Sequence, residues 1–264
     1  MKKLFLSILM SACAVTGFAQ TTLVLYYSEN GTTKTVAEEL QKQLGADIEA
    51  VEAVEPYTGD FGATIQRGNK ERQSGQGPAI KPLQKKISDY DVIFLGYPIW
   101  YGTYANPIVT LVKAEDFAGK TIVPFCTFGS GGLNTSAADL EKALPKAKIK
   151  KGYGVRAARV TKAEKELNRF LIENGYKKGS VEKLADFSEQ KPVTDADKAL
   201  FDEACSSYQM PLGTPKTVGK RATAEGTDYK FCVVGRGMDG KEATSIIYVT
   251  VEKGAKAEFT EVVR

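Results

Sequence analysis

Short apolar runs alternate with helical patterns over the first two thirds of the 264-residue chain. Continuous apolar runs predict buried strands, and apolar positions spaced by three and four predict helices. The predicted strands are 23–26, 48–51, 92–97, 122–126 and 150–155, and the predicted helices are 34–44, 106–113, 136–144 and 162–174. This alternation is typical of an α/β domain whose parallel sheet is covered by helices on both faces.

The pattern changes beyond about residue 179. A helix is predicted to begin at Thr194-Asp195 and to continue to Ala204. Runs rich in β-formers follow at 217–224, 229–234, 244–251 and 258–263, separated by glycine-containing turns. A helix followed by an antiparallel meander predicts a small α+β domain over residues 195–264. We expect it to be a structural appendage, with covering a site or binding a partner as the alternatives.

The first 19 residues have the pattern of a secretory signal peptide. Lys2 and Lys3 precede an apolar run that is short for a bilayer span, and small residues lie before Gln20. The alternative is a lipoprotein that is anchored through Cys13, but Met10 and the long apolar run after Cys13 fit that motif less well. Both interpretations predict export, to the periplasm or the cell surface if the signal is bacterial, without a membrane-spanning helix.

A hydroxyl-rich segment separates the first predicted strand from the first predicted helix. Its residues are Ser28, Glu29, Asn30, Gly31, Thr32 and Thr33. A helix N-terminus leaves backbone N–H groups unpaired and carries partial positive charge, so a segment of small residues there is suited to a phosphate. It lacks the lysine of a nucleotide P-loop and the G-x-G-x-x-G of a dinucleotide site. The pattern indicates a site for a monophosphate, and the alternative is a capped turn that binds nothing.

This stretch resembles the flavodoxin fingerprint. The matching residues are Tyr26, Ser28, Gly31, Thr33, Ala37 and Leu40. The resemblance implies a flavodoxin-like doubly wound five-stranded parallel sheet of order 2-1-3-4-5 over residues 20–178, of the short-chain type. It also implies that the segment holds the phosphate of FMN through the side chains of Ser28 and Thr33. Backbone contacts are expected from Glu29, Asn30, Gly31 and Thr32.

Two more segments follow predicted strands where such a fold would hold the flavin ring. The resemblance implies that Trp100 stacks on the ring and that backbone groups around it line the ring edge, and the alternative is that Trp100 plugs the domain edge. The residues concerned are Tyr97, Pro98, Ile99, Trp100, Tyr101 and Gly102. A glycine-rich loop is expected to bond the pyrimidine edge through Thr127, Phe128, Gly129, Ser130 and Gly131. This loop lacks the tyrosine that often covers the other ring face, so we expect that face to be open.

Tyr101 occupies the position after the stacking aromatic. A bulky residue is disfavoured at positive φ, so we expect the peptide here not to turn over and the flavin to behave more like a two-electron carrier. The polar, glycine-containing stretch 57–81 resembles a long connection in a bacterial flavodoxin subfamily, with counterparts to Arg67 and Glu71. The sequence assigns no role to either residue.

The amino-acid composition limits the kinds of catalytic and metal-binding site that the chain can form. The chain contains no histidine, which excludes imidazole catalysis and most zinc sites. Its formal net charge is +4, including the two leader lysines, and nothing in the charge pattern argues for nucleic acid. Because an exported chain favours disulfides, we expect Cys205 to pair with Cys232 and Cys126 to be a buried thiol, with three free thiols as the alternative.

These observations predict an exported FMN-binding protein that acts in electron transfer or simple flavin-dependent reduction, with an unknown redox partner. The alternative is a binding module that keeps the fold but has no functional flavin. The cofactor, and not the protein, would carry the redox chemistry. The sequence identifies no catalytic side chain and no metal ligand.

Overall fold

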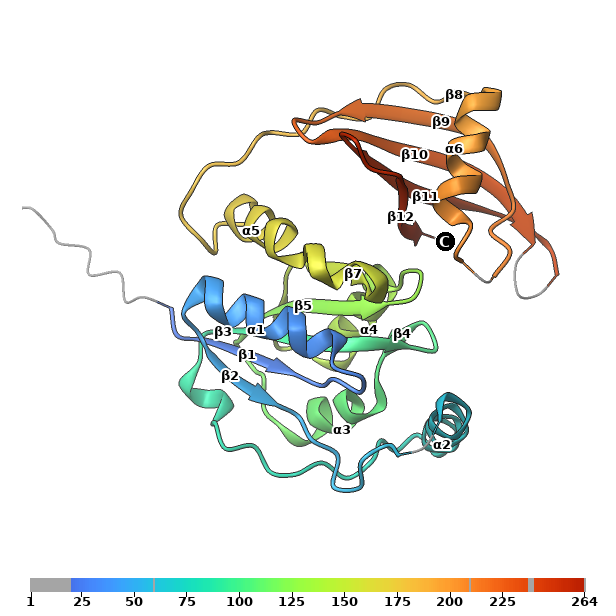
Figure 1. The fold of residues 1–264 in the computed structure, drawn as a ribbon. Coiled ribbons are helices and arrows are strands. Elements are labelled where there is room, and N and C mark those ends of the chain that lie inside the picture. The colour runs from blue at the N-terminus through green and yellow to red at the C-terminus, as the bar shows by residue number, and fades with distance from the viewer. Residues whose placement is uncertain (1–19, 59, 209, 237–239, 264) are drawn as a thin grey trace, which may run out of the picture.

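A computed structural model describes residues 20–263 of the protein except 59, 209 and 237–239. The predicted leader and Cys13 lie outside the described residues. The first domain contains β1 (Thr22–Tyr26), α1 (Thr32–Leu44), β2 (Asp47–Ala50), α2 (Phe61–Ser74), the 3-10 helix η1 (Ile87–Asp89), β3 (Val92–Trp100), β4 (Thr103–Tyr104), α3 (Asn106–Ala114), β5 (Thr121–Phe128), α4 (Leu133–Ala143), β6 (Lys148–Ile149), β7 (Tyr153–Arg156), the 3-10 helix η2 (Ala157–Lys162) and α5 (Ala163–Glu173). It is the lower part of the molecule in Figure 1.

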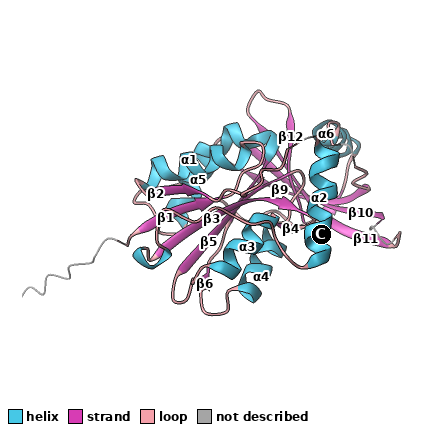
Figure 2. Cartoon of the chain, turned by 90° about the horizontal axis from the view of Figure 1, so that it is seen from below, coloured by secondary structure: helices cyan, strands magenta, loops and turns pink. Residues whose placement is uncertain are grey.

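The sheet of this domain confirms the predicted doubly wound order. Its strands run β2-β1-β3-β5, and β6 and β7 both pair with the outer side of β5. All of these pairs are parallel, while β4 forms an antiparallel hairpin with β3. Helices α1 and α5 cover one face and α3 and α4 cover the other, as Figure 2 shows. Alternate residues of β1 and β3 therefore enter two separate apolar layers.

The predicted fifth strand is divided into two short pieces. The carbonyl of Ile122 accepts a hydrogen bond from the N–H of Lys150. The backbone N–H and C=O groups of the even-numbered residues of β5 therefore point toward the outer neighbouring strand. Pro124 is the next residue with this orientation and has no N–H to donate. The ladder is interrupted there, between Ile149 of β6 and Tyr153 of β7. A proline inside a buried strand is the sequence signal for this interruption.

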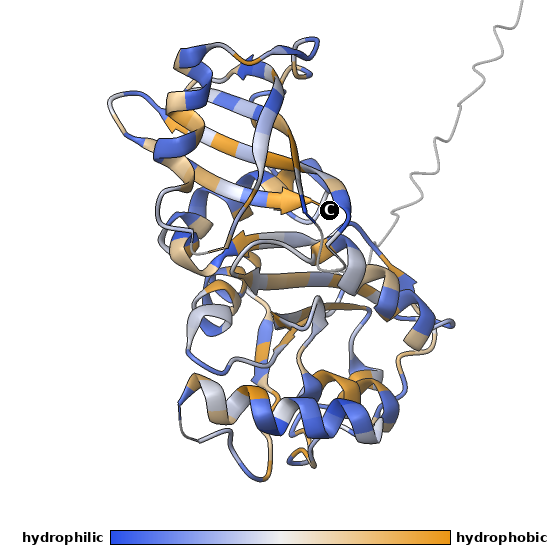
Figure 3. Ribbon diagram, turned by 90° about the vertical axis from the view of Figure 1, so that its right-hand side faces the viewer, coloured by the Kyte–Doolittle hydropathy of each residue, from blue (hydrophilic) through white to orange (hydrophobic). Residues whose placement is uncertain are grey.

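The second domain is an antiparallel meander with one helix. It contains β8 (Lys191–Pro192), α6 (Asp195–Cys205), β9 (Thr214–Ala222), β10 (Gly226–Arg236), β11 (Glu242–Glu252) and β12 (Ala257–Val263). The strand order is β12-β11-β10-β9-β8, so β12 is an edge strand. Helix α6 packs on one face, where the rings of Phe201 and Phe231 meet edge-to-face at 5.2 Å. In Figure 3 the strands of this domain carry both hydrophobic and hydrophilic residues, and the buried hydrophobic ones form one core with Phe201 and Ala204 of α6.

The start of α6 is held by a reciprocal cap. The side chain of Thr194 accepts a hydrogen bond from the N–H of Asp197, and the Asp197 carboxylate accepts one from the N–H of Thr194. Lys220 on β9 also pairs with Asp197 at 2.5 Å. Burial opposes ionisation, but the bonds from Lys220 and Thr194 prevail and lower the pKa of Asp197. The pair with Lys220 therefore ties the start of α6 to the sheet.

The predicted disulfide is wrong in this structure, where Cys126, Cys205 and Cys232 are all free. Phe231 and Val233 on β10 are fully buried against α6. Because side chains alternate across a strand, Cys232 between them faces the other side of the sheet, away from the core that Cys205 packs against. Cys126 is a buried thiol, as expected, and burial raises its pKa.

Among the described residues, none of the helices combines the length and the apolar character that crossing a bilayer requires.

A substitution at Gly96 tests how tightly the central strands are packed. A Cβ added at Gly96 would lie 2.0 Å from Cζ of Phe125, which is fully buried. We expect Gly96→Ala to lower the free energy of unfolding by about 1–3 kcal/mol because a packed ring cannot make room. Urea unfolding followed by the fluorescence of Trp100, the only tryptophan, measures this. Gly129→Ala is the control because a Cβ added at Gly129 would have no atom within 4 Å. Equal midpoints for both variants would contradict the packing argument.

Candidate functional site

Three segments meet at the carboxyl ends of β1, β3 and β5. We call them the first segment (residues 28–33), the second segment (residues 97–102) and the third segment (residues 127–131). The hydroxyl of Thr33 lies 2.8 Å from that of Thr127, which joins the first segment to the third. Ile99 packs against Gly132, just after the third segment. The carboxyl edge of an open α/β sheet, at the point where the strand order reverses, is where ligands bind.

The first segment forms the N-terminus of α1. Gly31 precedes the helix with φ of 86° and offers no side chain to cap it. Asn30 organises the turn, because its side-chain oxygen accepts bonds from the N–H of Thr32 at 3.2 Å and from the Thr32 hydroxyl at 2.8 Å. Backbone N–H groups at the start of a helix, with its positive dipole end, make an anion site. The segment therefore presents a helix N-terminus that is suited to an anion, and phosphate binding there stays a prediction.

Ser28 supplies the clearest sign of a ligand. Its hydroxyl oxygen is buried and has no hydrogen-bond partner among the described residues. A buried, unpaired hydroxyl costs free energy, and most such groups in proteins are satisfied. A phosphate oxygen in this segment would accept a hydrogen bond from the Ser28 hydroxyl. Thr33, the other side chain expected to contact a phosphate, is fully buried and faces Thr127.

The carboxylate of Glu29 is held at the side of the first segment by Tyr27, whose hydroxyl donates a hydrogen bond to it. Burial, and then this bond, raise the pKa of Tyr27, so the hydroxyl stays protonated and donates. Tyr27 also begins an aromatic group. Its ring meets Trp100 edge-to-face at 5.8 Å, and Tyr57 meets Trp100 edge-to-face at 5.0 Å. In the described part of the chain, neither aromatic neighbour stacks parallel to the indole.

The second segment is more regular than expected. Strand β3 continues to Trp100, and Tyr97 and Pro98 pair with Cys126 and Thr127 of β5. The side chain of Tyr97 is fully buried, and its hydroxyl lies 3.2 Å from that of Ser136. The predicted loop is therefore a strand end followed by the β3–β4 hairpin. Only Tyr101 and Gly102 form its turn.

The steric premise behind the expectation for Tyr101 is wrong, because this bulky residue does adopt positive φ. Tyr101 has φ of 51° and Gly102 has φ of 83°, the signs that a two-residue type I′ hairpin turn requires. The side chain compensates for this backbone conformation, because its hydroxyl donates a 2.8 Å bond to the carbonyl of Ile65 and its ring lies 5.1 Å from the guanidinium of Arg72. The steric argument for a two-electron carrier therefore does not hold.

Helix α2, which the sequence did not predict, is held through Glu71 to Tyr57 and to Asn106 at the start of α3, an arrangement that we call the Glu71 clasp. The Glu71 carboxylate accepts bonds from Arg67 at 2.9 Å, from Asn106 at 2.8 Å and from the Tyr57 hydroxyl. The guanidinium of Arg67 lies 4.0 Å above the Tyr57 ring. Arg67 and Glu71 thus hold the tyrosine that contacts Trp100. Their i,i+4 spacing is a helix signal that the polar composition of this stretch concealed.

The third segment is partly covered by the second domain. The N–H of Val262 on β12 donates a 2.8 Å bond to the carbonyl of Ser130. A side chain on Gly131 would collide with the carbonyl oxygen of Val262 at 2.2 Å. Gly131 therefore makes room for β12. Thr127 and Phe128 belong to β5 and are buried, while a Cβ at Gly129 would meet no atom.

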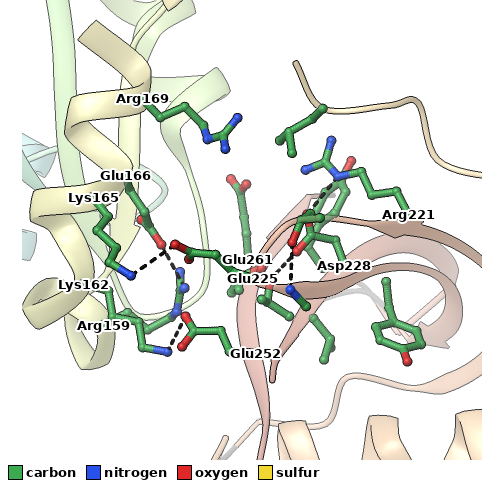
Figure 4. Close-up of a pocket in the computed structure, with 18 of the residues that line it drawn as sticks. Arg159, Lys162, Lys165, Glu166, Arg169, Arg221, Glu225, Asp228, Glu252 and Glu261 are labelled. Carbon is green, nitrogen blue, oxygen red and sulfur yellow. Dashed lines mark hydrogen bonds and ion pairs between the residues drawn. The ribbon is translucent and has the colours of Figure 1, made fainter. Parts of the chain in front are cut away.

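A separate cleft of about 570 Å³ lies between the domains, and Figure 4 shows its charged lining. Side chains from η2 and α5 face strands β10 to β12. Lys162 pairs with Glu252 at 3.1 Å and with Glu258 at 2.7 Å, and Arg159 pairs with Glu258 at 3.2 Å. Burial opposes ionisation of Glu258, yet Lys162 and Arg159 lower its pKa. Since its cations are matched by carboxylates, the cleft is an ion-paired interface.

Comparison with known proteins decides the family. The flavodoxin family model matches residues 21–174, more than half of the chain. The chain belongs to the flavodoxin family. The match ends before β8, so the second domain of this flavodoxin-family protein lies outside it.

Solved structures match over just over half of the chain. A candidate flavoprotein from Bacteroides eggerthii is 33% identical, with 58% of this chain and 96% of that chain covered and a TM-score of 0.52. One from Bacteroides uniformis is 27% identical, with 57% and 99% covered and a TM-score of 0.51. A flavoprotein from Lactobacillus acidophilus, solved in complex with FMN, is 25% identical, with 55% and 98% covered and a TM-score of 0.47. The comparison with curated proteins found no match.

Glu71→Gln tests the clasp. The amide keeps the shape of the side chain but loses the negative charge that accepts hydrogen bonds from Arg67, Asn106 and Tyr57. We expect α2 to open more readily, with amide hydrogen exchange over 61–74 faster by about 10- to 100-fold, as loss of bonds to a buried charge would give. Exposed Glu55→Gln is the control. Unchanged exchange in α2 would show that Glu71 does not hold the helix.

Proposed function

We propose that this protein binds FMN at the three segments and acts as an exported electron carrier or simple flavin-dependent reductase. The observation that carries the proposal is the buried, unpartnered hydroxyl of Ser28 beside the start of α1, where Gly31 offers no capping side chain. Membership of the flavodoxin family supports the same site, because the family match includes all three segments. Bound FMN would supply the redox chemistry, and the protein would bind and orient it.

Each segment has a separate task in this proposal. Ser28 and the first-turn N–H groups of α1 hold the phosphate, with the turn shaped by Asn30. Trp100, braced by Tyr27 and Tyr57, lies beside the ring. Backbone N–H groups of Gly129 and Ser130 would bond the pyrimidine edge, since their carbonyls accept bonds from Arg156 and Val262. No histidine is present, so imidazole contributes nothing to proton transfer.

Export is part of the proposal and depends on the first 19 residues. Two lysines, an apolar run and small residues before Gln20 support a signal peptide, with lipidation of Cys13 as the alternative. The site would then operate in the periplasm or at the cell surface, with a redox partner of that compartment.

Titration of the mature protein with three flavins tests FMN binding. The first segment is suited to a terminal phosphate, which riboflavin lacks and which FAD uses as a bridge. We expect quenching of flavin fluorescence to show tighter binding of FMN than of riboflavin or FAD. Equal affinity for FMN and riboflavin would contradict the phosphate site. Absence of flavin binding would favour a module without flavin.

Ser28→Ala separates the two roles of the hydroxyl. We expect about tenfold weaker FMN binding, since a bond to a charged phosphate is lost, and little change for riboflavin. Without FMN, the variant should be at least as stable as the wild type, because an unpaired buried hydroxyl has been removed. Exposed Ser88→Ala, which lies just before β3 at the opposite edge of the sheet, is the control. Unchanged FMN affinity in Ser28→Ala would exclude Ser28 from the site.

A further inference from the structure

The last strand of the second domain reaches the third segment of the site. Strand β12 pairs with β11 on one side, and its other edge has no neighbouring strand among the described residues. That edge is where the N–H of Val262 donates to the carbonyl of Ser130. The absence of a side chain at Gly131 allows this close approach. The second domain thus contacts a loop that the proposed function places against the flavin.

Arg156 links the same loop and the same strand from the first domain. It ends β7, next to β5 in the sheet. Its Nε donates a 2.8 Å bond to the carbonyl of Gly129, and its Nη1 donates a 2.9 Å bond to the carbonyl of Phe259. The guanidinium also lies 4.2 Å from the Phe259 ring. One planar cation therefore fixes the loop and β12 relative to each other.

We propose that the second domain is a clamp on the flavin site and that Arg156 is its positioning residue. The clamp consists of Arg156, Phe259 and Val262 acting on Gly129 and Ser130. It holds the carbonyls of the third segment so that the remaining groups of the loop face the ring edge. This inference rests on the proposed function, because it concerns the affinity for FMN.

Coupling between docking of the second domain and FMN binding is reciprocal. Beyond the clamp, ion pairs join the domains, among them the exposed pair of Lys165 and Glu225 at 3.1 Å and the pair of buried Arg159 with Glu258 at 3.2 Å. Exposed pairs contribute little stability each. Residues 177–190 between the domains contain no helix or strand. Linkage requires that if docking of the second domain favours FMN binding, FMN binding favours docking by the same factor.

If the second domain is only a structural appendage, loss of Arg156 should give a different result. Loss of Arg156 would then lower stability but leave the affinity of the folded protein for FMN unchanged. A clamp predicts that affinity falls and that FMN alters the dynamics of β12. These two readouts separate the clamp from a structural role.

Three variants of the full mature chain test the clamp by FMN titration. Arg156→Met keeps apolar contact with Phe259 but loses both bonds, and we expect about tenfold weaker binding. Arg156→Lys keeps the charge and can bond one carbonyl, so it should recover part of the affinity. Arg169→Met is the control, since Arg169 on α5 pairs with Glu173 and Glu182, away from the loop. Its affinity should stay within about twofold of the wild type.

Hydrogen exchange of the wild-type protein gives an independent measurement. We expect saturating FMN to slow exchange in the peptide 257–263, which includes the Val262 amide. If wild type binds FMN while Arg156→Met binds it equally well, or FMN leaves this peptide unchanged, the clamp is overturned and the proposed function stands. If wild type binds no FMN, the proposed function fails and the clamp fails with it.

Discussion

The parallel ladder formed by β1, β3 and β5 is the constraint on which the site depends. Each strand is buried on both faces, so a shift of register would expose apolar side chains on one layer and crowd the other. Because parallel strands end at the same edge, fixing the ladder also fixes where the three segments meet. The contact between the hydroxyls of Thr33 and Thr127 is one result. The site is therefore assembled by the core.

Most polar groups of the first segment have hydrogen-bond partners inside the protein, and one hydroxyl has none. Asn30, Glu29 and Thr33 all have partners inside the protein. Ser28 does not, although its hydroxyl is buried. An organised segment with one unsatisfied hydroxyl at a helix N-terminus suits a single anionic group better than a set of mobile side chains would. This agrees with a phosphate that is bound without a balancing lysine.

The sequence predicted those features that arise from local pattern. Continuous apolar runs identified the central strands, and the hydroxyl-rich turn identified the first segment, because both are consequences of burial and of helix-end chemistry. Helix α2 was missed because it is mostly polar and is held by the Glu71 clasp. The predicted disulfide was wrong because the alternation of Phe231, Cys232 and Val233 along β10 directs Cys232 away from the core that Cys205 packs against. The contact of Val262 with Ser130 joins residues far apart in sequence, and no local pattern reports it.

A crystal structure of the full mature chain grown with FMN would test the account most directly. The account predicts the FMN phosphate within hydrogen-bond distance of the Ser28 hydroxyl and of the first-turn N–H groups of α1, with the ring beside Trp100 and Val262 still bonded to Ser130. A phosphate bound elsewhere, such as in the charged cleft between the domains, or a ring away from Trp100, would contradict it.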